Sequence, residues 1–153
     1  MSKRLTFIVA SIVFVIVCAS PVWCQPPRHS GQRGCAQETI IYDNGNTLAC
    51  ETTRRAAFTL DEEVYVTRIV AWSNGDIDGG RLAARLSGPR NRSEELMSTE
   101  GAGQWQWSER IYPIGRVMPA GNYYVDFSKH SVCQNSQSSG NGFVKVYGCR
   151  DYY

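Results

Sequence analysis

The feature that most limits the fold of this chain is a succession of short β-prone runs separated by turn residues. Turn pairs such as Asn44-Gly45, Asn74-Gly75 and Gly88-Pro89 divide the runs, and no stretch keeps a helical apolar period for three turns. The runs are rich in β-branched and aromatic residues and cover residues 39–43, 56–60, 64–72, 81–86, 104–112, 122–127 and 143–147. This spacing predicts an all-β, antiparallel β-sandwich.

Alternation along two of the runs indicates which side chains face the core. Tyr123, Val125 and Phe127 share one side of their run, and the valines 144 and 146 form the apolar side of the last run. The run 64–72 is less regular, because Thr67 and Arg68 interrupt both sides of it. A β-bulge in that strand, or a strand with one amphipathic face, would explain this irregularity.

The N-terminal segment has the order of a secretory signal peptide. Lys3 and Arg4 precede an apolar run over residues 5–19, which is shorter than the roughly 20 residues needed to span a bilayer. Cleavage after Ala19 leaves five cysteines and cleavage after Cys24 leaves four, and the even number favours the second site. We predict a signal peptide over 1–24, a flexible leader over 25–34, a β-sandwich domain over 35–150, and a secreted, extracellular or periplasmic protein. An uncleaved anchor over residues 5–23 is the alternative.

The charge balance argues against a nucleic-acid partner. The chain has 16 Lys and Arg against 14 Asp and Glu, and Lys3 with Arg4 supplies the whole excess. The mature chain is therefore neutral, whereas nucleic-acid-binding domains are usually basic. Arg54, Arg55, Arg90 and Arg92 form either a patch for an acidic ligand or ordinary solvated surface.

Four cysteines remain after cleavage at Cys24, and an oxidising compartment pairs them. Local pairing joins Cys35 with Cys50 and Cys133 with Cys149. The nested alternative joins Cys35 with Cys149 and Cys50 with Cys133, and its index sums of 184 and 183 match the constant sum of antiparallel strands. Spacing favours the nested pairing slightly. No close Cys or His pair indicates zinc.

Several segments together resemble a family of secreted modules. They are the residues 41–45, 58–60, 65–69, 118–124, 134–136 and 142–144, within a similarity that spans nearly all of 38–148. In this combination the chain resembles secreted bacterial-type jelly-roll modules, which are similar in architecture to carbohydrate-binding and galactose-binding-like domains. The resemblance implies a jelly-roll sandwich and, more weakly, a glycan ligand. The four mature cysteines depart from that family's pattern.

Aromatic residues are the candidate ligand contacts. Trp105 and Trp107 are two residues apart, so on a strand both project from one face, either as a stacking platform for sugar rings or as core residues. Trp72 precedes a polar loop and is a better candidate for exposure. Tyr124 and Asp126, on the outer side of their run, complete the candidate set.

The loop after Trp72 places oxygen-bearing side chains at alternate positions. Asn74, Asp76 and Asp78 resemble the start of a calcium loop, but the twelfth position is Arg85, which excludes an EF-hand. A partial structural calcium site and a solvated hairpin loop are the two interpretations. No other cofactor is indicated.

The sequence contains little that indicates catalysis. Of the two histidines, His29 lies in the leader and His130 lies in a loop with no nucleophile beside it, where we expect it to be solvated. The residues Asn91-Arg92-Ser93 form a glycosylation sequon. We therefore expect a secreted, non-catalytic binding module for a glycan or a cell-surface protein. The alternatives are a structural or protein-interaction domain, a secreted inhibitor, and a small hydrolase.

Overall fold

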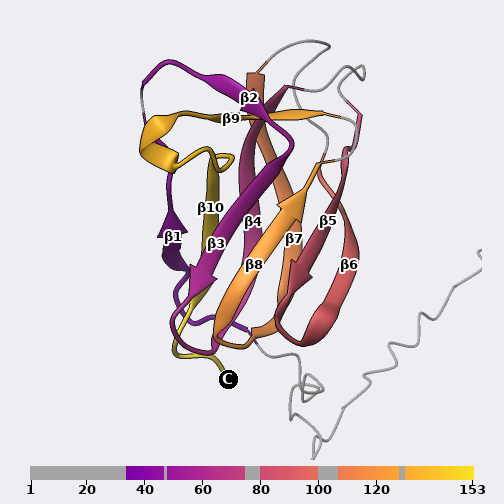
Figure 1. The fold of residues 1–153 in the computed structure, drawn as a ribbon. Coiled ribbons are helices and arrows are strands. Elements are labelled where there is room, and N and C mark those ends of the chain that lie inside the picture. Colours follow the sequence, from indigo (N-terminus) through magenta and orange to yellow (C-terminus); the bar gives the residue numbers. More distant parts are fainter. Residues whose placement is uncertain (1–33, 47, 75–79, 100–106, 128–129) are drawn as a thin grey trace, which may run out of the picture. The chain divides into compact units, whose positions relative to one another are not determined.

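The computed structural model describes residues 34–46, 48–74, 80–99, 107–127 and 130–153 (Figure 1). These residues belong to one compact unit, Gln32–Tyr153. The predicted signal peptide and almost all of the predicted leader lie outside the described residues. The described strands are β1 (Thr39–Asp43), β2 (Glu51–Thr53), β3 (Arg55–Leu60), β4 (Val64–Asn74), β5 (Ala83–Gly88), β6 (Arg92–Met97), β7 (Trp107–Met118), β8 (Gly121–Asp126), β9 (Ser131–Gln134) and β10 (Val144–Cys149). Two 3₁₀ turns, η1 (Pro89–Asn91) and η2 (Ser136–Ser138), complete the elements.

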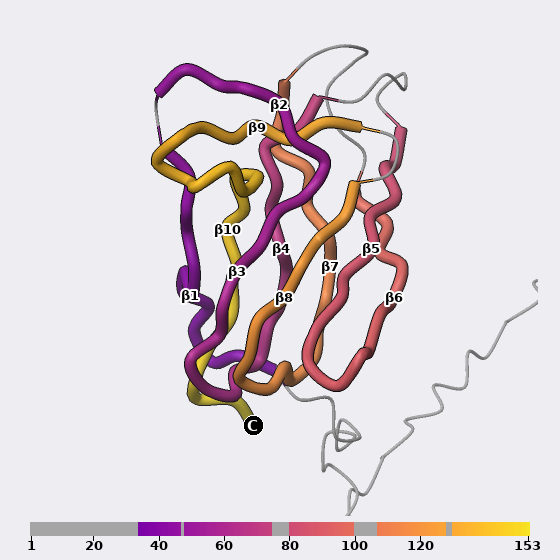
Figure 2. The backbone as a smooth tube through the Cα atoms, viewed as in Figure 1, coloured from indigo at the N-terminus to yellow at the C-terminus, as the bar shows by residue number. Residues whose placement is uncertain are grey.

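The strands form two antiparallel sheets, which confirms the predicted disulfide-bonded β-sandwich. One sheet has six strands in the order β1-β10-β4-β9-β2, with β7 on β4. The other has four strands in the order β3-β8-β5-β6. The chain crosses between the two sheets several times. The first strand, β1, pairs with the last, β10, so an indigo segment lies beside a yellow one in Figure 2. The specific jelly-roll order stays a prediction.

Strand β4 is the centre of the six-stranded sheet. It pairs with β7 along its whole length, and β10 and β9 follow each other along its other edge. The register shifts between Val66 and Arg68 in the β4 pairing with β7, so of the two explanations for the irregular run the bulge is the one observed. Because a bulge adds one residue, the side chains after Thr67 change sides. Val66 and Ile69 therefore both enter the core.

The core lies between the two sheets and has the predicted composition. Tyr123, Val125 and Phe127 of the β8 segment are buried, as are Val144 and Val146 of β10. Phe58 of β3 stacks on Tyr123 with ring centroids 5.2 Å apart. Large buried side chains of this kind each contribute about 1.5–3 kcal/mol to folding.

The two disulfides have the nested connectivity. Cys35 bonds Cys149, and Cys50 bonds Cys133. The physical reason is the antiparallel pairing of the chain ends, since β1 lies on β10 and β2 lies on β9. The compact unit continues past the predicted boundary at residue 150, because Tyr152 forms a bridge with Cys35.

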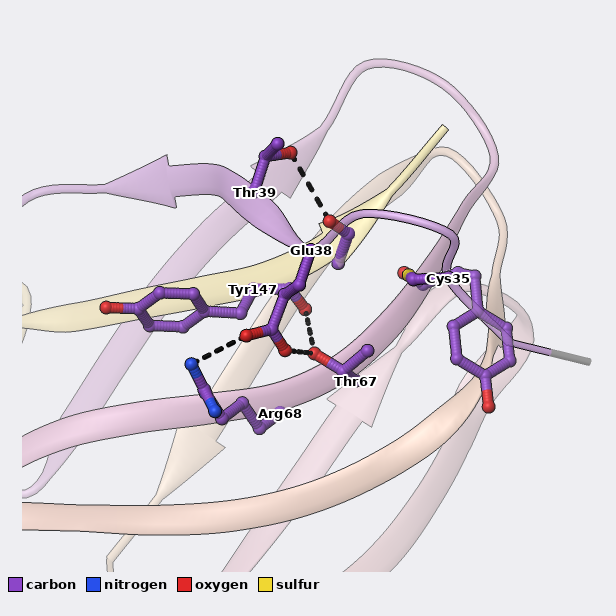
Figure 3. Close-up of polar contacts among 8 residues, drawn as sticks. Cys35, Glu38, Thr39, Thr67, Arg68 and Tyr147 are labelled. Atoms are coloured by element: carbon purple, nitrogen blue, oxygen red, sulfur yellow. Dashed lines mark hydrogen bonds and ion pairs between the residues drawn. The ribbon is translucent and has the colours of Figure 1, made fainter. Parts of the chain in front are cut away.

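A polar cluster fastens the segment before β1 to β4 and β10 (Figure 3). Glu38 pairs with Arg68 at 2.6 Å and accepts a hydrogen bond from the Thr67 hydroxyl. The Thr67 hydroxyl also lies 3.1 Å from the Tyr147 carbonyl oxygen, and the Arg68 guanidinium lies 4.3 Å from the centre of the Tyr147 ring. The Arg68 guanidinium therefore has both an ion-pair partner, Glu38, and an aromatic partner, Tyr147.

Three short strands were absent from the sequence prediction. They are β2, β6 and β9. Strand β6 has the sequence RSEELM, whose charged residues carry little β-propensity, and it forms because β5 pairs with it across the η1 turn. Strand β7 also extends to Met118, six residues past the predicted end at Tyr112.

Candidate binding sites

Trp72 projects from the outer face of the six-stranded sheet. Its neighbours Ile69 and Ala71 belong to the core, so alternation turns Val70 and Trp72 outward. The Trp72 side chain is 41% exposed. It pairs across the strands with Glu109 of β7, which is also exposed. The expected exposure of Trp72 is therefore observed.

An open groove of about 480 Å³ lies beside the Trp72 indole. Its polar lining includes Asn46, Glu109 and Lys145, and its apolar lining includes Leu48, Trp72 and Phe143. Leu48 is 51% exposed, so two large apolar side chains face solvent in one groove. We call this site the Trp72 groove.

Residues 45, 46, 48 and 50 line one wall of the Trp72 groove, and this wall is tied down at several points. The Asn44 amide nitrogen donates to the Gly142 carbonyl at 3.1 Å, and its oxygen accepts from the Val144 backbone at 2.8 Å. Asn46 exchanges hydrogen bonds with the buried Asn135, which caps η2. The Cys50–Cys133 disulfide also lines the groove. This wall is therefore held by both hydrogen bonds and a covalent bond.

The two other tryptophans are described unequally. Trp105 lies outside the described residues, so its role as platform or core residue stays a prediction. Trp107 is half-buried at the start of β7, pairs with Asn74, and is absent from the core cluster. Two residues before Glu109, it lies on the same outer face as Trp72, at the diagonal position where large side chains reach each other.

Tyr124 and Asp126 lie on the other sheet, in β8. Tyr124 is 44% exposed, and the Arg55 guanidinium lies 5.6 Å from the centre of its ring. Asp126 pairs with Arg55 at 2.5 Å. The structure thus divides the candidate ligand set between two sheets and leaves Tyr124 and Asp126 away from the Trp72 groove.

The calcium hypothesis concerns a loop that is only partly described. Asn74 ends β4, and its side-chain oxygen is buried without a hydrogen-bond partner. Asp76 and Asp78 lie outside the described residues. Among the residues that are described, no group of three His, Cys, Asp or Glu side chains is placed to hold a metal ion. The calcium site stays a prediction.

His130 is buried, so the expectation of a solvated loop histidine is wrong. Only 4% of it is exposed, because its ring meets the edge of Phe127 with centroids 5.0 Å apart. Its Nε2 lies 3.0 Å from the Tyr112 hydroxyl. Burial raises the pKa of Tyr112 well above its ordinary value. The pair therefore belongs to the interior of the sandwich.

A second cleft, of about 440 Å³, lies beside the β5–β6 hairpin. Its lining includes Arg90, Arg92, Glu94 and Arg116, and a floor formed by Met118 and Tyr123. We call this site the hairpin cleft. Arg90 and Arg92 were part of the arginine patch considered from sequence, whereas Arg116 was not, because it comes from β7 and only the fold brings it near.

Comparison of the chain with protein-family models, curated proteins and solved structures found no match. In the described part of the chain, no helix has the length and apolar character required to cross a membrane. The two disulfides are typical of proteins that fold in an oxidising compartment.

Proposed function

We propose that the mature chain is a secreted, non-catalytic binding module that binds a glycan in the Trp72 groove. One observation carries the proposal: a tryptophan that is 41% exposed forms part of a groove of about 480 Å³ lined by Asn46, Glu109 and Lys145. The signal-like segment 1–24 and the two disulfides support export.

The chemistry of the groove suits a sugar ring. A sugar presents one face of C–H groups, which packs on an indole and excludes water, and a rim of hydroxyls. Glu109 accepts and Lys145 donates hydrogen bonds, and the Asn46 amide nitrogen, which gives one N–H group to Asn135, donates with its second, so the rim of the sugar finds both kinds of partner. Lys145 lies 3.7 Å from Asp43, which holds its ammonium group near the groove.

Trp72→Ala tests this assignment against Tyr124→Ala as a matched control. Both substitutions remove an exposed aromatic ring, 41% and 44% exposed, but from opposite sheets. The unmodified chain would first be screened on an array of neutral oligosaccharides, and its affinity for the strongest binder would be measured by titration calorimetry. We expect Trp72→Ala to weaken binding roughly tenfold or more, since it removes a large apolar contact.

Tyr124→Ala should leave the affinity within about twofold, and thermal unfolding should show that both variants fold. Equal losses in the two variants, or no loss in Trp72→Ala, would contradict the proposed site. Absence of any oligosaccharide binder would contradict the ligand class.

A protein-interaction domain is the second candidate, and Leu48 favours it. This side chain is 51% exposed in the same groove as Trp72, and an exposed leucine offers nothing to a sugar hydroxyl. Leu48→Ser separates the two functions. A glycan site keeps its oligosaccharide affinity, whereas a site for an apolar side chain of a partner loses most of its affinity for that partner.

A further inference from the structure

Positive charge is concentrated in the hairpin cleft of a mature chain that is neutral overall. Three arginines, Arg90, Arg92 and Arg116, line the cleft with one acid, Glu94. Arg116 is paired with Glu94. No ion pair joins Arg90 or Arg92 to an acidic side chain of the described residues, so two guanidinium groups are left for a ligand. Arg68 differs from them, because its guanidinium contacts both Glu38 and the Tyr147 ring.

The floor of the cleft is apolar and firmly packed. Leu86, Met118 and Tyr123 line it and are each at most 4% exposed. The Tyr123 ring is fixed from below by stacking on Phe58, and its hydroxyl donates to the Pro119 carbonyl at 2.7 Å. An apolar floor in the same cleft as two arginines that have no ion-pair partner among the described residues suits a ligand with both a ring and an anionic group.

The turn that presents Arg90 is held in an uncommon backbone conformation. Arg90 and Asn91 have φ values of 63° and 55°, the left-handed region that few residues other than glycine adopt. Close packing holds the turn in place: a Cβ on Gly121 would lie 2.4 Å from the Pro89 ring. A Cβ on Gly88 would lie 2.4 Å from the Tyr123 ring. The two arginines are therefore presented by a rigid turn, which lowers the entropy lost when a ligand binds.

We propose that the hairpin cleft binds the sulfate or carboxylate group of an acidic glycan. Arg90 and Arg92 donate paired N–H groups to the oxyanion, because the planar guanidinium matches the geometry of two acceptor oxygens. The sugar ring that carries the anion packs on the apolar floor. This site lies apart from the Trp72 groove and takes a different ligand, so it does not depend on the function proposed above.

The double variant Arg90→Asn with Arg92→Gln tests the site. Asparagine tolerates the left-handed backbone of position 90, and glutamine keeps much of the length of the position 92 side chain while losing its charge. The matched control is Arg54→Gln with Arg81→Gln, which removes the same charge from exposed positions outside the cleft. The probes are a sulfated uronic-acid disaccharide, its unsulfated neutral counterpart and inorganic sulfate, titrated against protein that carries no glycan on Asn91.

We expect the cleft variant to bind the sulfated disaccharide at least tenfold more weakly, and the control to bind within about twofold of the unmodified chain. The neutral disaccharide should bind at least tenfold more weakly than the sulfated one. Equal losses of affinity in both double variants would mean that net charge alone explains the effect, and would overturn the proposal. Inorganic sulfate binding as tightly as the disaccharide would make this a free-anion site and would overturn the glycan part.

Two further variants keep the outcome interpretable. If the double variant unfolds, Arg92→Gln alone, which leaves the turn untouched, should weaken binding about threefold or more, and an unchanged affinity overturns the proposal. Trp72→Ala should leave this binding unchanged. A loss in Trp72→Ala equal to that in the cleft variant would mean that the sulfated disaccharide binds in the Trp72 groove instead.

Discussion

The Trp72 groove and the hairpin cleft are built in different ways on one sandwich. The groove combines residues far apart in the sequence, namely residues 45, 46, 48 and 50 with residues of β4, β7 and β10, and a disulfide closes one of its walls. The cleft combines the β5–β6 hairpin with residues 116–119 and with Tyr123 of β8, and glycines allow these parts to approach closely. A disulfide therefore fixes one wall of the first site, and close glycine contacts fix the turn of the second.

This difference means that each site has its own weak point. A covalent bond and a strand register hold the Trp72 groove, so a loss of ligand binding there should accompany a loss of global stability. Gly88 and Gly121 allow the close packing that holds the hairpin cleft, so one added methyl group at either position should deform it. Substitutions that disturb one site and leave the other intact test whether the two are independent.

The largest effect is expected for Cys50→Ser with Cys133→Ser. The disulfide joins residues separated by 83 positions, so its removal should lower the free energy of unfolding by about 4–5 kcal/mol in the chain-entropy model. Urea denaturation measures the loss. Glycan affinity at the groove should fall as well, while binding at the hairpin cleft should persist in the folded fraction.

Cys35→Ser with Cys149→Ser is the control for this prediction. Its loop of 114 residues is comparable, so the loss of stability should be similar, but this disulfide does not line the groove. Equal loss of groove affinity in both double variants would show that the Cys50–Cys133 bond has no local role there.

Gly121→Ala should have the next largest effect, and on the other site. The new Cβ would lie 2.4 Å from Pro89, and the φ of 144° at this position is one that residues with a side chain rarely adopt. We expect a loss of about 3 kcal/mol in the free energy of unfolding, together with weakened binding of the sulfated probe. Affinity at the Trp72 groove should not change.

Gly45→Ala is the matched glycine substitution in the wall of the groove. Its Cβ would lie 3.1 Å from the Asp43 carboxylate and 3.9 Å from Cε of Lys145, and both atoms are near the ends of flexible side chains. The loss should stay below about 1 kcal/mol. A larger loss than that of Gly121→Ala would reverse the proposed contrast between the two sites.

Tyr123→Phe should have the smallest effect, and one that depends on pH. It removes the hydrogen bond to Pro119 and should cost about 1 kcal/mol at neutral pH. Burial raises the pKa of Tyr123 above its ordinary value, and the nearby Arg116 opposes this in part. The folded chain therefore keeps the phenol proton longer than the unfolded chain, so this contribution is present below about pH 10 and is lost as the pH rises further.

The stability difference between the unmodified chain and Tyr123→Phe should accordingly shrink above pH 10, as measured by urea denaturation across pH. Tyr124→Phe, on the exposed neighbour in β8, should change stability by only a few tenths of a kcal/mol at neutral pH. A difference for Tyr123→Phe that grows above pH 10 would contradict the assigned direction of the pKa shift.

Much of the fold was predictable because strand signals are local. The alternation in 122–127 and 143–147 identified the core side chains correctly, and the irregular run 64–72 indicated the bulge in β4. The spacing of the cysteines favoured the nested disulfides only slightly over local pairing, and the structure has the nested pairs. Strands such as β6 escaped prediction because pairing with β5, and not their own composition, makes them strands.

The candidate sites were less predictable, because each depends on side chains that only long-range pairing assembles. Trp72 was only the better candidate for exposure among the three tryptophans, and its neighbours Asn46 and Lys145 reach it through the pairing of β10 with β1 and β4. Arg116 comes from a part of β7 that the sequence prediction did not include. His130 lies in a polar segment, yet packing against Phe127 and Tyr112 buries it.

The sequence by itself determined the class of fold, the side chains of the core and the near balance of charge, 16 Lys and Arg against 14 Asp and Glu, because alternation, turn residues and charge are local or additive properties. The tertiary structure decided which aromatic and charged side chains share a surface. Strand register and sheet membership set these neighbourhoods, and both result from the packing of the whole chain. They place Trp72 and Tyr124 on different sheets, and they bring Arg116 into the same cleft as Arg90 and Arg92.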